Sequence, residues 1–137
     1  MHKEIETLLP HRNPFLYVDE IVTCSPEEIY GTKIYSDQDL FLRGSFPDFN
    51  YVPGTILLES MAQCGGAGIR KLGITGGLFG LASIEAATFL KGVEYNKLVS
   101  IVIKNIKLGD RLIRQSGVTY SDGSSALEAT WTCIRFK

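Results

Sequence analysis

The run Thr55-Ile56-Leu57-Leu58-Glu59-Ser60-Met61-Ala62-Gln63-Cys64-Gly65-Gly66-Ala67-Gly68-Ile69 decides the fold. Apolar residues occupy almost every side of this run, which is typical of a helix enclosed by protein. Four residues break the pattern, and their spacing is four, three and four: Glu59, Gln63, Gly66 and Arg70. The spacing places these four residues along one stripe of the predicted helix.

The segments on both sides of this helix are predicted to be strands, because they are rich in β-branched and aromatic residues and are bounded by turn residues. The predicted strands are Phe15 to Val22, Ile29 to Tyr35, Leu78 to Ile84, Ala87 to Leu90, Leu98 to Leu108, Leu112 to Tyr120 and Ala126 to Phe136. An Asp-Gly turn at Ser121-Asp122-Gly123-Ser124 predicts that the last two form a hairpin. In the last strand, alternate residues are expected to lie on one buried face: Leu127, Ala129, Trp131 and Cys133. One enclosed helix against five or six mostly antiparallel strands is an α+β architecture.

Composition narrows the class of protein. The length of 137 residues fits one domain over residues 1–137. With 14 Lys and Arg against 15 Asp and Glu, the net charge of -1 disfavours nucleic acid. Three cysteines without a CxxC pair disfavour a disulfide framework and a zinc site, and favour the reducing cytoplasm. The first residues do not resemble a signal peptide, and no apolar stretch reaches the length of a membrane span.

Glu59 is the candidate for chemistry, because a carboxylate on an enclosed helix is paired, protonated or lining a cavity. The structural alternative is an internal ion pair or hydrogen bond to Arg70, Gln63 or a loop amide. Pro53 and Gly54 favour the functional interpretation, since they deliver the chain into the helix start, where free amides attract a negatively charged oxygen. Glycine also lets a ligand approach the backbone closely.

The segment Gly44 to Gln63 resembles the G-H-F-P-G-x-P-x-x-P-G-V-L-x-x-E-A-M-A-Q signature of the 3-hydroxyacyl-(acyl-carrier-protein) dehydratases of fatty-acid synthesis. The opening Leu9 to Asp19 is similar to their L-P-H-R-x-P-F-L-L-V-D motif, and Leu127 to Thr130 is similar to their C-E-A-T strand. The matches lie at both ends and in the centre of the chain. A twenty-residue match with fixed Pro, Gly, Glu and Gln positions is far more specific than a three-residue motif.

The resemblance implies a hot-dog fold, in which an antiparallel sheet wraps one long helix, and a dimer with an acyl-phosphopantetheine tunnel between its protomers. It implies a site that combines a histidine of one protomer with a glutamate of the other. The histidine takes the C2 proton, the glutamate assists departure of the C3 hydroxyl, and helix-start amides polarise the thioester carbonyl. In this chain the matching residues are Glu59 and the Gly54 amide, with Phe46, Pro53 and Gln63 as expected substrate contacts.

The family's histidine falls on Ser45, and the glycine three residues later falls on Asp48. A neutral serine hydroxyl has no basicity near pH 7 and itself needs a base. Asp48 and His11 are the alternative bases, although an exposed loop carboxylate and a structural imidazole are the more ordinary interpretations. The remaining histidine, His2, lies near the terminus.

The leading hypothesis is a dehydratase-family lyase subunit of fatty-acid, polyene or polyketide synthesis, with an unusual base or with Glu59 in a site shared with a histidine-bearing partner. Two alternatives stay open, a non-catalytic acyl-binding or scaffold subunit and a thioesterase. The resemblance implies no metal and no cofactor beyond the carrier protein's phosphopantetheine. The expected partners are acyl carrier protein and a second copy or a related dehydratase, with a trimer of dimers also open.

Overall fold

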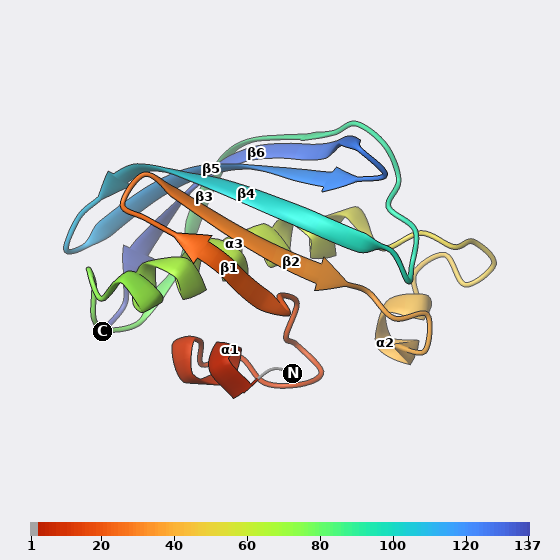
Figure 1. The fold of residues 1–137 in the computed structure, drawn as a ribbon, viewed down its shortest axis with the longest axis horizontal. Helices are drawn as coiled ribbons and strands as arrows, with labels where there is room; N and C mark the ends of the chain where they lie inside the picture. The colour runs from red at the N-terminus through yellow and green to blue at the C-terminus, as the bar shows by residue number, and fades with distance from the viewer. Residues whose placement is uncertain (1–2) are drawn as a thin grey trace.

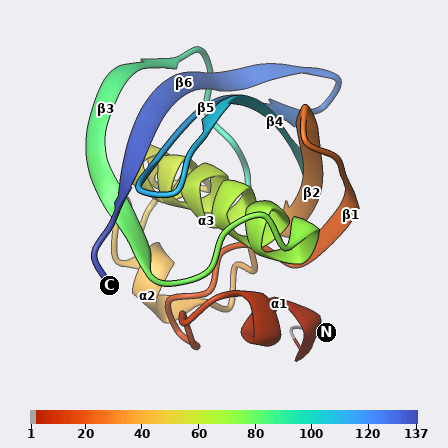
Figure 2. The ribbon, with the colours of Figure 1, turned by 90° about the vertical axis from the view of Figure 1, so that its left-hand side faces the viewer.

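The computed structural model describes residues 3–137. These residues form three helices and six strands. Their order is α1 (Lys3–Leu8), β1 (Glu20–Cys24), β2 (Glu28–Ile34), α2 (Leu40–Arg43), α3 (Gly54–Leu72), β3 (Phe79–Phe89), β4 (Leu98–Leu108), β5 (Leu112–Ser121) and β6 (Ser124–Arg135). All strand pairs are antiparallel, and the order in the sheet is β1-β2-β4-β5-β6-β3. The sheet curls around α3, and α1 lies on the open side (Figures 1 and 2). The predicted α+β hot-dog architecture is confirmed.

The enclosed helix forms because both of its broad faces find apolar partners. Leu57, Met61, Cys64 and Ala67 are almost fully buried against the concave face of the sheet. Burial alternates along β4 and β5, as expected for strands with one face on the core. The helix ends at Gly73, whose φ of 71° is the left-handed conformation that favours glycine.

The predicted C-terminal hairpin is confirmed. Ser121 pairs with Ser124, and the two turn residues Asp122 and Gly123 have φ values of 52° and 79°. Positive φ at both central positions is the geometry for which Asp-Gly is favoured, because this turn matches the twist of the strands. Trp131, 1% exposed, lies on the buried face of β6 as the alternation predicts.

Two strand predictions are corrected by the structure. The segments 78–84 and 87–90 form one continuous strand, β3, which pairs along its length with β6. The strand predicted from Phe15 begins only at Glu20, because the Tyr17 amide donates to the Gln63 side chain, 2.8 Å, instead of to a neighbouring strand. The segment before β1 is therefore buried against α3.

The segment from α2 to α3 is mostly irregular, as the sequence predicts for its Pro, Asp and Asn residues. The Arg43 side chain holds it in place, since its guanidinium donates to the Phe49 and Pro47 carbonyls at 3.2 and 3.5 Å. Val52 donates to the Val93 carbonyl at 2.8 Å, which joins the end of the segment to the body of the protein. Within residues 3–137, no helix is long and apolar enough to cross a membrane.

Candidate active site

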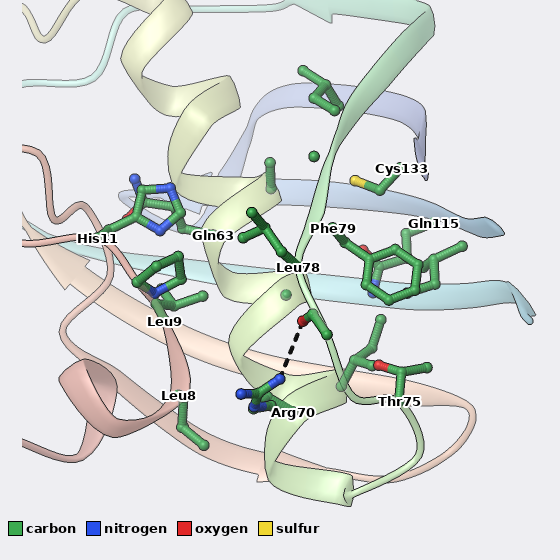
Figure 3. Close-up of a pocket in the computed structure, with 18 of the residues that line it drawn as sticks. Leu8, Leu9, His11, Gln63, Arg70, Thr75, Leu78, Phe79, Gln115 and Cys133 are labelled. Atoms are coloured by element: carbon green, nitrogen blue, oxygen red, sulfur yellow. Dashed lines mark hydrogen bonds between the residues drawn. The ribbon is translucent and has the colours of Figure 1, made fainter. Parts of the chain in front are cut away.

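A cavity of about 470 Å³ runs along one face of α3 (Figure 3). The four residues of the predicted stripe, Glu59, Gln63, Gly66 and Arg70, all line it. Much of the remaining wall is apolar and comes from the end of α1 and the segment after it, from α3 itself, from the start of β3 and from β5 and β6. It includes Leu8, Leu9, Ile69, Leu78, Phe79, Leu81, Ile113 and Cys133. From Glu59 to Arg70 the helix rises roughly 16 Å. The cavity is therefore an elongated pocket whose wall carries the Glu59 carboxylate and many apolar side chains.

Gln63 fixes the position of the Glu59 carboxylate. Its side-chain amide donates to Glu59 Oε2 at 3.0 Å and to the Phe15 carbonyl at 3.4 Å, and its oxygen accepts from the Tyr17 amide at 2.8 Å. The side chain of Glu59 is 28% exposed, so the carboxylate reaches the cavity. The sequence left open a purely structural hydrogen bond between Glu59 and Gln63. That bond is present, but the carboxylate still lines the cavity.

His11 lies opposite this carboxylate. Its Nε2 is 3.9 Å from Glu59 Oε2, and the imidazole lines the same cavity. Figure 3 shows the ring beside Gln63, while Arg70 lies further along α3 and donates to the Gly77 carbonyl at 3.2 Å. From the sequence, His11 was one of two alternative bases, and a structural role was the more ordinary interpretation. Its place beside Glu59 depends on the path of residues 9–15, which no local pattern reveals.

Two groups near Glu59, the Cys133 thiol and the Tyr17 phenol, have pKa values raised above their usual ones. Burial, and to a smaller extent the charge of Glu59, raises the pKa of the Cys133 thiol to about 11. Burial raises the pKa of the Tyr17 phenol above its usual value, and Asp39 and Glu59 add to the effect. Both groups therefore stay protonated near pH 7. The alternation along β6 predicted that Cys133 faces inward, but only the structure places its thiol in this cavity.

The motif residues of the loop lie elsewhere. Within residues 3–137, Ser45, Phe46, Pro53 and Gly54 are not part of the cavity wall. Ser45 is half-buried, whereas Phe46 and Asp48 are exposed. The structure therefore brings Glu59, Gln63 and His11 together and leaves Ser45 and Asp48 outside the cavity. His2 is outside the described residues.

The start of α3 has no side-chain cap. Pro53 precedes the helix and makes no side-chain capping hydrogen bond, while the Ile56 and Leu57 amides donate to its carbonyl at 3.0 and 3.3 Å. The Gly54 and Thr55 amides stand where a helix lacks internal acceptors. A Cβ on Gly54 would lie 3.0 Å from the Phe89 ring, so this position is tightly packed.

Comparison with known proteins identifies the family. A family model described as ApeP-like, ApeP dehydratase, matches residues 3–71. A 3-hydroxyacyl-(acyl-carrier-protein) dehydratase FabZ of Oleidesulfovibrio alaskensis is 33% identical over 134 residues, which cover 95% of this chain and 87% of the relative. The chain belongs to this dehydratase family. A FabZ of Fusobacterium nucleatum is 32% identical over 133 residues, covering 96% of this dehydratase-family chain and 94% of the relative.

Solved structures agree with this dehydratase family in fold. A chain of the dehydratase heterocomplex ApeI:P from Xenorhabdus doucetiae matches with a TM-score of 0.79 at 17% identity. The match covers 97% of this chain and 91% of the ApeI:P chain. A hypothetical thioesterase with coenzyme A from Streptococcus pneumoniae has a TM-score of 0.68 at 14% identity, with 98% and 96% covered. At these identities the likeness shows the fold alone.

Proposed function

We propose that this chain is a subunit of a 3-hydroxyacyl thioester dehydratase that acts on acyl groups carried by acyl carrier protein, in fatty-acid or polyene or polyketide synthesis. The observation that supports this most is the Glu59 carboxylate, held by Gln63 on the wall of an apolar cavity of about 470 Å³. The family's substrate has a polar reacting end and an apolar chain. The cavity suits such a substrate, because Glu59, Gln63 and His11 lie together on its wall and apolar side chains make up much of the remaining lining.

The chemistry assigned to Glu59 is general acid catalysis. A base takes the C2 proton of the 3-hydroxyacyl thioester, the C2–C3 double bond forms, and the C3–O bond breaks as Glu59 donates a proton to the departing hydroxyl. The products are a 2-enoyl thioester and water. The helix-start amides at Gly54 are proposed to polarise the thioester carbonyl, with Phe46 and Pro53 near the entering substrate. A positioned acid or base contributes about 10²–10⁴-fold to such a reaction.

The missing histidine at position 45 is proposed to come from a partner, so that a mixed dimer joins the partner's histidine to Glu59. The outer edge of β3 supports such a pairing. Within residues 3–137, β3 pairs only with β6, and Leu81, Ile84 and Phe89 on it are 43–50% exposed. Long apolar edges promote pairing with another chain. The structural neighbour ApeI:P is itself a dehydratase heterocomplex.

Other parts of the proposal follow from the same chemistry. Substrate arrives on the phosphopantetheine of acyl carrier protein, and elimination of water needs no redox or metal cofactor. Acyl carrier protein and a second hot-dog subunit, either a copy of this chain or a related dehydratase, are the proposed partners. Three free cysteines support a reducing, cytoplasmic compartment.

The test compares Glu59→Gln with the parent chain, alone and after mixing with a histidine-bearing relative, on a 3-hydroxyacyl carrier-protein substrate. We expect Glu59→Gln to lower enoyl formation by about 10²–10⁴-fold in whichever assembly is active. The matched control is Glu28→Gln, which changes an exposed carboxylate on β2 outside the cavity wall.

Product identity separates the alternatives. Release of free acid instead of enoyl product would identify a thioesterase. Retained binding of acyl carrier protein with no turnover in either assembly, and no effect of Glu59→Gln, would identify a scaffold subunit and would overturn the proposed function.

A further inference from the structure

His11 is held in a defined position on the wall of the cavity. Leu9, two residues before His11, is buried, and the Arg12 guanidinium donates to the Leu9 and His11 carbonyls at 2.9 and 2.7 Å. The Phe15 amide donates to the Arg12 carbonyl at 2.8 Å and closes the turn that follows. The His11 and Phe15 rings are stacked, with centroids 6.3 Å apart. The imidazole therefore faces α3 because of several contacts made by its own segment.

The two nitrogens of His11 have different surroundings. Nδ1 is buried and has no hydrogen-bond partner among the described residues. Nε2 faces Glu59 Oε2 at 3.9 Å, which is beyond hydrogen-bond distance. Gln63 already donates to that oxygen at 3.0 Å. Nε2 therefore makes no hydrogen bond to the carboxylate. A substrate bound at Glu59 would also lie next to Nε2.

With Glu59 assigned as the acid, His11 is the remaining candidate for the base among the described residues of the cavity wall. The ionisable residues that line the cavity are His11, Glu59, Arg70 and Cys133. Arg70 stays protonated in proteins. Burial raises the pKa of Cys133 to about 11, so its thiol remains protonated near pH 7. Asp48 and Ser45 lie outside the wall. Histidine is also the side chain best suited to gain and lose a proton near neutral pH.

We propose that His11 is the base that works with Glu59 of the same chain, so that an assembly of this chain with itself dehydrates its substrate without a histidine at position 45. This inference rests on the proposed function. It concerns an assembly in which every copy has serine at position 45. In a mixed dimer, the partner's histidine meets Glu59, whereas in the self-assembled protein His11 takes its place.

The proton transfers balance within the pair. The neutral imidazole of His11 removes the C2 proton at Nε2, the C–H electron pair forms the C2–C3 double bond, and the hydroxyl leaves as water with the proton of the Glu59 carboxyl group. The pair is then imidazolium and carboxylate. A proton returns from Nε2 to Oε2, directly or through one water molecule, once the enoyl thioester leaves.

The experiment uses the purified chain assembled with itself and a 3-hydroxyoctanoyl pantetheine thioester as the probe. We expect His11→Gln to lower kcat for enoyl formation by about 10²–10⁴-fold, with KM and the thermal midpoint close to those of the parent. The matched control is His2→Gln, which removes the other of the two histidines and keeps the parent kcat. A His11→Ala variant tests the chemistry directly, since added imidazole is expected to restore turnover.

Three results would overturn the role of His11: full kcat in His11→Gln, failure of imidazole to rescue His11→Ala, or a self-assembled parent that is inactive while its mixture with a histidine-bearing relative is active. The last result leaves the proposed function standing. If His11→Gln loses its fold, the imidazole rescue of His11→Ala decides. Loss of the proposed function has a different signature, in which Glu59→Gln changes nothing in either assembly.

Discussion

The two halves of the motif from Gly44 to Gln63 behave in opposite ways. The helix half, Gly54 to Gln63, has its partners inside the chain: Met61 is 0% exposed and Gln63 bonds three groups around it. The loop half, Gly44 to Pro53, displays its aromatic rings, with Phe46 and Phe49 62% and 61% exposed. The contrast shows that the fold buries the helix half of the motif and leaves the aromatic rings of the loop half exposed.

The largest expected effect on stability comes from the helix half. Met61→Ala deletes a fully buried side chain against the sheet and should lower the free energy of unfolding by about 2–5 kcal/mol, because it removes apolar burial and leaves a cavity. Denaturant unfolding followed by circular dichroism measures the loss. Phe49→Ala is the matched change in the loop half. Equal losses for the two variants would contradict the contrast.

Gln63→Leu should have a smaller effect on stability, about 1–3 kcal/mol. It leaves the buried Tyr17 amide without its acceptor and releases the Glu59 carboxylate. Activity should fall together with stability, since the carboxylate loses its fixed position. Asn50→Leu, an exposed amide in the loop half, serves as the control. Thermal unfolding and enoyl formation, measured on both variants, check the prediction, and unchanged activity in Gln63→Leu would contradict the positioning role.

The smallest expected effect on the protomer is that of Phe46→Ser combined with Phe49→Ser. Both rings are exposed, so the free energy of unfolding should change by no more than about 0.5 kcal/mol for each. Assembly should weaken instead, because exposed apolar rings mark interaction surfaces and we expect a second subunit to cover these two. Sedimentation velocity of the parent and the double variant tests this. An unchanged assembly with a destabilised protomer would reverse the interpretation of the loop half.

The activity of a monomeric variant distinguishes His11 from a partner's histidine as the base. A variant that stays monomeric should keep the contact between His11 and Glu59, since both belong to one chain. Residual dehydration by such a monomer would support the base within the chain.

Much of the site was readable from the sequence because helical spacing is a local property. The stripe from Glu59 to Arg70 follows from the period of the helix alone, and all four of its residues line the cavity. The Asp-Gly hairpin and the bounds of β4, Leu98–Leu108, are equally local. The strand predicted from Phe15 was wrong in its first part because a long-range hydrogen bond from Tyr17 to Gln63 replaces strand pairing there.

By itself the sequence determined the α+β class, the enclosed helix and the carboxylate on its polar stripe, since each depends on periodicity, turn chemistry or the cost of burying charge. Only the tertiary structure decided what faces that carboxylate. His11 and Glu59 are far apart along the chain. Their Nε2 and Oε2 atoms come within 3.9 Å only because α1 and the turn before β1 pack against α3. Contacts of that kind arise from the burial of whole elements against one another, and no local pattern encodes them.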